Sequence, residues 1–160
     1  MKCNNECTTC NTLCETSCPV CHMKAKKVNI EASKNMLKDP SFLLDDKTTY
    51  ICNNRKCEVT YFQADNPVVY LKEDLVKPIW FKEALPNQII CYCYNIYFKD
   101  IIKIVNETDA PLTIEDVKSR FVKIKDASCD THNPIGESCE VLFKNALEFA
   151  YHKKERKEWF

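Results

Sequence analysis

Hydrophobic and polar residues follow two different patterns along this chain, and the change comes near its middle. In the first half, short segments rich in β-branched and aromatic residues are separated by Asp, Asn and Pro, a pattern typical of strands joined by turns. We therefore expect a small β-rich domain, with strands at residues 28–30, 48–52, 58–62 and 68–71.

In the second half, apolar residues recur at helical spacing. One predicted helix follows Asn95, a residue type that caps helix N-termini. A second covers residues 114–124, where Thr113 and Asp116 have the spacing of a capping box. A third begins at Cys139. The apolar residues of these helices would form a packed core, and they need no further explanation.

The pattern predicts an α+β fold, with a small metal-stapled β domain followed by a small all-helical domain. Two prolines and a loss of periodicity mark a connection between them. The predicted divisions are a Cys-rich leader at 1–17, a β domain at 18–72, a linker at 73–88, a helical domain at 89–152 and a charged, fraying tail at 153–160.

Composition and charge narrow the function classes. The chain has 160 residues, with 23 basic and 23 acidic side chains, so net charge gives no reason to expect nucleic acid or an anionic membrane as partner. No segment approaches the ~20 apolar residues needed to cross a bilayer. The first residues lack the apolar core of a secretory signal, so we expect a cytoplasmic protein.

The chain contains twelve cysteines, which fall into three groups. In a reducing compartment, cysteines at short spacing are metal ligands more often than disulfides, although disulfides remain the alternative. The groups are Cys3, Cys7, Cys10 and Cys14; then Cys18, Cys21, Cys52 and Cys57; then Cys91, Cys93, Cys129 and Cys139.

The first group lies in the polar leader at residues 1–17. Its soft thiolates suit zinc or cuprous copper, which makes the leader a candidate for an extra metal site. The alternative is a weakly structured segment whose cysteines are incidental. The sequence leaves both interpretations open.

The second group forms two short turns, CxxC at 18–21 and CxxxxC at 52–57. Two such pairs fit a closed, tetrahedral zinc site, which would supply folding free energy to a domain too small to be stable alone. In the second turn, Asn53 and Asn54 are expected to take the left-handed conformation that glycine would normally provide. His22 is expected to face solvent because four thiolates already fill the coordination shell.

The third group combines a CxC pair, Cys91 and Cys93, with the widely separated Cys129 and Cys139. Alternate residues of an extended segment share a face, so the CxC pair can bind one centre. These spacings are not those of zinc turns and favour four thiolates around a [2Fe–2S] cluster. Helix N-termini expected after Cys93 and at Cys139 would stabilise an anionic centre. His132 is expected to be at most a neighbour of the ligands.

The sequence contains no recognisable catalytic motif: there is no Gly-rich phosphate loop, no G-x-S-x-G and no convincing Cys/His/Asp arrangement. We therefore expect a carrier or binding protein more than an enzyme. The first hypothesis is a one-electron carrier or reductant. The alternatives are a metallochaperone or metal-sensing module that uses the leader cysteines, and a structural interaction protein stapled by zinc.

Five motifs follow one another along the chain: CPVC at 18–21, YIC at 50–52, CEVTYF at 57–62, IICYCYN at 89–95 and Asn-Pro-x-Gly at 133–136. In this order, they resemble the amino-terminal part of CopZ-type copper chaperones.

The resemblance extends over about residues 18–152. It implies a zinc-binding β domain joined to a [2Fe–2S] domain similar to bacterioferritin-associated ferredoxin, with the second and third cysteine groups as the respective ligands. It also implies a redox partner protein or a copper-handling protein, in copper or iron homeostasis. The heavy-metal-associated domain of that family, with its MxCxxC copper loop, does not appear before Phe160, which leaves the leader as the place for any Cu⁺.

Overall fold

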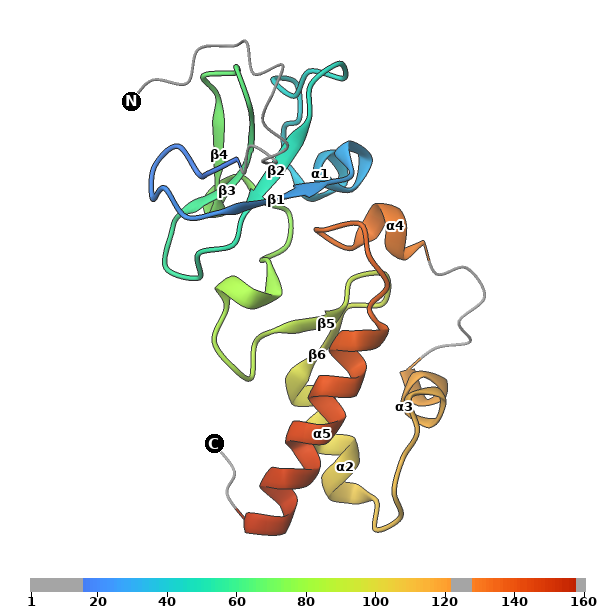
Figure 1. Cartoon of the computed structure of the whole chain (residues 1–160). Helices are drawn as coiled ribbons and strands as arrows, with labels where there is room; N and C mark the ends of the chain where they lie inside the picture. The colour runs from blue at the N-terminus through green and yellow to red at the C-terminus, as the bar shows by residue number, and fades with distance from the viewer. Residues whose placement is uncertain (1–15, 122–127, 158–160) are drawn as a thin grey trace, which may run out of the picture.

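The computed structural model describes residues 16–121 and 128–157. The chain forms a sheet region in its first half and a mainly helical region in its second half, with the segment around α4 lying beside the sheet region (Figure 1). The predicted α+β class is confirmed. The leader cysteines, Cys3, Cys7, Cys10 and Cys14, lie outside the described residues.

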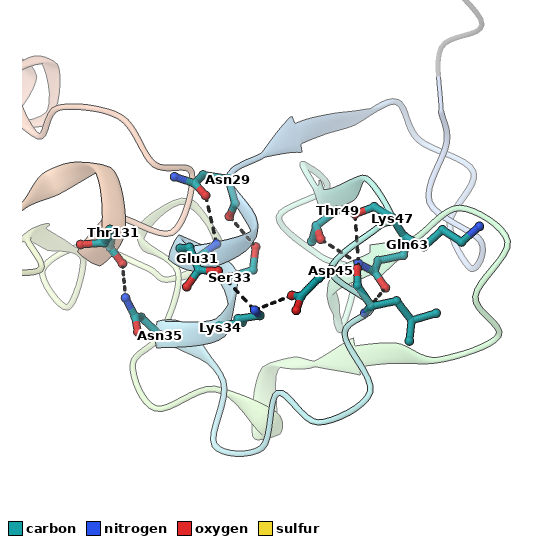
Figure 2. A network of polar contacts seen from close by, with 11 residues as sticks. Asn29, Glu31, Ser33, Lys34, Asn35, Asp45, Lys47, Thr49, Gln63 and Thr131 are labelled. Atoms are coloured by element: carbon teal, nitrogen blue, oxygen red, sulfur yellow. Dashed lines mark hydrogen bonds and ion pairs between the residues drawn. The ribbon is translucent and has the colours of Figure 1, made fainter.

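The sheet region is a four-stranded antiparallel sheet in the order β1-β2-β3-β4. Three predicted strands are confirmed within one or two residues, whereas the first was placed too late in the chain. Asn29 ends that strand and caps a helix that the sequence pattern did not predict, because its Oδ1 accepts a hydrogen bond from the Glu31 N–H at 3.0 Å (Figure 2). The elements are β1 (Ala25–Val28), α1 (Ile30–Met36), β2 (Thr49–Cys52), β3 (Val59–Gln63) and β4 (Val69–Leu71).

The connection between the two regions is an ordered segment that follows the sheet. It contains two short 3-10 helices, η1 (Lys72–Asp74) and η2 (Trp80–Lys82). Leu75 forms a β-bridge with Leu37 at the end of α1, which ties the start of the connection to the sheet region.

The second region begins with a small hairpin, so the prediction of an all-helical domain was wrong in this respect. Strands β5 (Ile89–Cys91) and β6 (Ile96–Tyr97) pair before the first helix. Asn95 lies in the hairpin turn with a φ of 54° and does not cap a helix; the capping residue is Tyr97, whose N–H donates to Asp100 Oδ2 at 2.8 Å.

Among the described residues, four helices follow the hairpin. The Thr113–Asp116 capping box of the second is confirmed, since each backbone N–H donates to the other side chain. The last helix continues to Arg156 and so includes the first four positions of the predicted charged tail. The helices are α2 (Phe98–Glu107), α3 (Ile114–Phe121), α4 (Cys129–His132) and α5 (Glu140–Arg156).

One hydrophobic core runs through both regions. It extends from Ile51 and Tyr61 in the sheet, through Tyr92 in the hairpin turn, to Ile101 and Phe143 in the helices. A second, smaller cluster surrounds the cysteines of the sheet region. Because the larger core is continuous, the two halves of the chain hold each other in place.

Candidate metal centres

The second cysteine group forms a compact site at one end of the sheet region. The sulfur atoms of Cys18, Cys21, Cys52 and Cys57 all lie within 4.8 Å of one another. A zinc ion bound tetrahedrally through Zn–S bonds of about 2.3 Å holds its sulfurs roughly 3.8 Å apart. The four thiols therefore fit a closed zinc site that requires little rearrangement.

Backbone hydrogen bonds shape the turns that present these thiols. In the first turn, Cys18 O accepts the His22 N–H at 2.9 Å, and His22 has a φ of 59°. In the second, the Asn54 side chain accepts the Lys56 N–H at 3.0 Å. Among the described residues, Asn53 and Asn54 are not left-handed, so that prediction was wrong; Asn54 shapes the turn through its side chain instead. His22 is exposed and does not belong to the set.

The electrostatics of this site differ from one thiol to the next. A hydrogen bond from the Met23 backbone lowers the pKa of Cys21 to about 6, whereas burial raises the pKa of Cys52 and Cys57. Metal binding requires the thiolate form and so competes with protons at the latter two.

Lys82 of η2 lies beside the second turn of the zinc site. It is buried, and its Nζ donates to Asn54 O at 2.7 Å and to Cys57 O at 3.1 Å. Four thiolates around one zinc ion carry a net negative charge, which this ammonium group can balance. The sequence analysis missed Lys82, because no local pattern marks a lysine as buried.

The cysteines of the third group lie near one another, where the turn between β5 and β6 faces residues 129 and 139. These two residues are the ends of the segment that contains α4. Cys91, Cys129 and Cys139 line a cavity of about 60 Å³, together with Tyr94, Lys118, Ser138, Glu140 and Phe143. The hydrogen bond from the Cys91 thiol lowers the pKa of Cys139 to about 6 despite burial. The same bond, together with burial, raises the pKa of Cys91.

Cys93 lies at the edge of this group. It is partly exposed and does not line the cavity, but it is close enough for its charge to contribute to the raised pKa values of Cys91 and Cys129. Within the described residues, only the first site gathers its ligand atoms within 4.8 Å. The third group is therefore more widely spread than the ligands of one tetrahedral ion.

The secondary structure around the third group differs from the prediction at one ligand. Cys139 caps α5, so it lies at a helix N-terminus as expected. Cys93 does not, because β6 separates it from α2. His132 is exposed, and its Nδ1 lies 3.0 Å from Ser128 O, away from the cavity lining.

The sheet region holds the segment that carries Cys129 and Cys139. The Tyr61 hydroxyl of β3 donates to Pro134 O at 2.7 Å, and the Asn29 amide donates to Asp130 O at 3.3 Å. Asn35 of α1 donates to Thr131 O at 3.0 Å (Figure 2). These contacts fix the position of the segment relative to the sheet.

Comparisons with known proteins agree with the interpretation of the first site as a zinc site. Residues 15–76 match the sequence profile of the CopZ-type zinc binding domain. The fold is similar to the X-ray structure of the Archaeoglobus fulgidus CopZ N-terminal domain, with a TM-score of 0.60 and 21% identity, over 91% of this chain and 100% of that one. A comparison with curated proteins gave no match.

Residues 15–76 are thus similar to a CopZ-type zinc-binding domain, and the four-cysteine site that fits zinc is Cys18, Cys21, Cys52 and Cys57. The structural likeness extends beyond that domain and shows that the mainly helical region shares the fold as well. In the part of the chain that the structure describes, no helix is long and apolar enough to cross a membrane.

Proposed function

We propose that this chain is a zinc-stabilised one-electron carrier that binds a [2Fe–2S] cluster through Cys91, Cys93, Cys129 and Cys139. The observation that carries this proposal is the convergence of three thiols, from three separate segments, on one small cavity, with a fourth thiol, Cys93, at its edge. Their wide spread suits two irons better than one zinc ion, and the donor set contains only the thiolates that such clusters need.

When bound, the cluster would supply one-electron transfer, and the surrounding residues would set its potential and access. The buried Phe143 lines the cavity with an apolar ring, while the α5 N-terminus directs its positive dipole end toward Cys139. Lys118, which lines the cavity, adds a positive charge near the sulfurs. The partly exposed Cys93 gives the site an edge that a partner can approach.

The resemblance to copper chaperones suggests the physiological electron acceptor. We place the protein in the cytoplasm and in copper handling, with cupric ion or a copper-handling protein as the electron acceptor. Each transfer would oxidise one reduced cluster and convert one Cu²⁺ to Cu⁺. The leader cysteines are the candidate site for binding the Cu⁺ that is formed.

Anaerobic reconstitution tests cluster binding. The protein should gain visible absorption and contain two irons, two sulfides and one zinc per chain. Cys93→Ser should lose the iron and the colour but keep zinc, whereas Cys52→Ser should lose zinc. A wild-type protein that stays colourless and iron-free would refute the proposal and leave a structural zinc protein as the better interpretation.

Cupric ion tests the direction of electron flow. Dithionite-reduced protein, freed of excess reductant, should recover its oxidised visible spectrum on addition of one equivalent of Cu²⁺, and a cuprous chelator should detect one Cu⁺. Free thiols also reduce Cu²⁺, so the assay needs a variant in which Cys3, Cys7, Cys10 and Cys14 are serine. If that variant no longer reduces Cu²⁺, the leader and not the cluster is the reductant.

A further inference from the structure

Asn133 is a buried amide that contacts a proposed cluster ligand. It is 1% exposed, and its Nδ2 donates to Cys139 Sγ at 3.4 Å. Its Oδ1 accepts the Ile135 N–H at 2.9 Å. Because the oxygen faces a backbone donor, the orientation of the amide is fixed, and its N–H group must face the sulfur.

The backbone around Asn133 leaves the side chain little freedom. The Gly136 N–H donates to Asn133 O at 2.8 Å and closes a turn with Asn first, Pro second and Gly fourth, an arrangement favoured in type I turns. The Asn133 N–H donates to Cys129 O at 2.9 Å. Asn133 is therefore bonded to both cysteines of its segment, through its backbone to one and through its side chain to the other.

The sheet region holds this turn from the other side. The buried Tyr61 hydroxyl donates to Pro134 O, and Gly136 packs so closely on α1 that an added Cβ would lie 3.0 Å from Asn29 Cβ. The turn cannot rotate away from the sulfur without breaking these contacts. The Asn133 amide is thus preorganised toward Cys139.

We propose that Asn133 is a positioning residue that fixes the Cys139 sulfur and raises the reduction potential of the cluster through an N–H···S hydrogen bond. This inference rests on the proposed function. The reduced cluster carries one more negative charge than the oxidised cluster, so a donor to a ligand sulfur stabilises the reduced form more. Removal of that donor lowers the potential.

The test compares three variants of the reconstituted full chain. Asn133→Asp and Asn133→Ser both keep an oxygen that can accept the Ile135 N–H but remove the N–H directed at the sulfur. Asn35→Ala removes a contact to the same segment, at Thr131 O, without touching Cys139. Redox titration should give potentials in the order Asp below Ser below wild type, because Asp adds a negative charge, with Asn35→Ala equal to wild type.

A second readout identifies the hydrogen bond itself. In D₂O, the Fe–S stretching bands of the wild type should shift in resonance Raman spectra, and both Asn133 variants should lose part of that shift. Loss of the cluster in the Asn133 variants but not in Asn35→Ala, with zinc retained in all, would support the positioning function. Bound cluster with unchanged potential and an unchanged deuterium shift would overturn the inference. A wild type without a cluster would instead refute the proposed function.

Discussion

The Tyr61→Phe substitution would test how strongly the sheet region holds the segment between Cys129 and Cys139. It removes one oxygen atom from a side chain that is 0% exposed and breaks its 2.7 Å hydrogen bond to Pro134 O. The ring still fills its place, so no large cavity forms. The buried Pro134 carbonyl loses its donor, which costs about 1–3 kcal/mol of unfolding free energy.

Tyr70→Phe is the matched control. Tyr70 is 5% exposed on the adjacent strand, and its hydroxyl makes no hydrogen bond among the described residues, although the backbone of Phe42 and Leu43 lies nearby. The same atom is removed from an equally buried ring, but no accepting group is left unpaired. This substitution should therefore leave the stability unchanged or raise it slightly.

Urea unfolding of the zinc-loaded proteins, followed by circular dichroism, measures both changes. Free zinc must be equal in all samples because it stabilises the folded state by mass action. Tyr61→Phe should lower the unfolding free energy by about 1–3 kcal/mol, and hydrogen exchange should become faster in residues 129–139. The argument fails if Tyr61→Phe costs no more than Tyr70→Phe, or if exchange in that segment is unchanged.

Two further substitutions test neighbouring contacts. Gly136→Ala should cost roughly 1–2 kcal/mol in the same urea assay, because Gly136 has a φ of 70° and its Cβ would crowd Asn29; unchanged stability would show that the turn can relax. Lys82→Met should release zinc faster to a chromogenic chelator, because it removes a buried charge and two hydrogen bonds at the second zinc turn. Lys72→Met, which removes only a surface pair with Glu58, should release zinc at the wild-type rate, and equal rates for both would argue against charge balance by Lys82.

The sequence predicted best what depends on residues close together in the chain. Strands β2 to β4 follow runs of β-branched and aromatic residues, and the zinc ligands come from two turns with diagnostic spacing. The capping box at Thr113 likewise involves only residues three positions apart. Each of these features is fixed by local backbone chemistry, so a single sequence suffices to find it.

Two local errors arose where one residue type serves two structures. Asparagine caps helices and also tolerates left-handed backbone, so its presence alone does not show which of the two structures forms. Asn95 was predicted to cap a helix but lies left-handed in the hairpin turn, while Asn29 caps α1 in a segment that was taken for a strand. The Asn29–Glu31 spacing was the available signal for the missed helix.

The long-range supports of the second and third cysteine groups could not be predicted from one sequence. Tyr61 and Pro134 are 73 positions apart, and Lys82 lies 25 positions from Cys57. Nothing in the periodicity of either segment shows that these residues meet. The Asn-Pro-x-Gly motif contributed to the family resemblance, but only the fold brings the amide of Asn133 to the sulfur of Cys139.

The segment with the other two cysteines of the third group is also tied to the sheet region. Tyr92 lies between Cys91 and Cys93, and its hydroxyl donates to Pro78 O and accepts the Trp80 N–H, both at 2.8 Å. Two residues after Trp80, Lys82 bonds the second zinc turn. A continuous set of hydrogen bonds therefore joins the zinc turn, η2 and the CxC pair.

These connections predict that the cluster site depends on bound zinc, whereas the zinc site does not depend on the cluster. The sheet and its two turns supply all four zinc ligands, so loss of the cluster should leave zinc bound. Loss of zinc should loosen both the Tyr61 contact and the Lys82 contact, because a domain this small depends on its metal for stability. Both segments that carry the cluster ligands would then lose their supports.

Metal release from the reconstituted protein tests this order. In Cys93→Ser, which cannot complete the cluster, zinc should leave to a chelator at the wild-type rate. In Cys52→Ser, which lacks a zinc ligand but keeps all four cluster cysteines, the cluster should form in lower yield and lose its visible absorption several-fold faster than in the wild type. Equal cluster lifetimes in Cys52→Ser and wild type would mean that the second region holds its ligands without help from the zinc domain, and the continuous core between the two regions would then be the sufficient support.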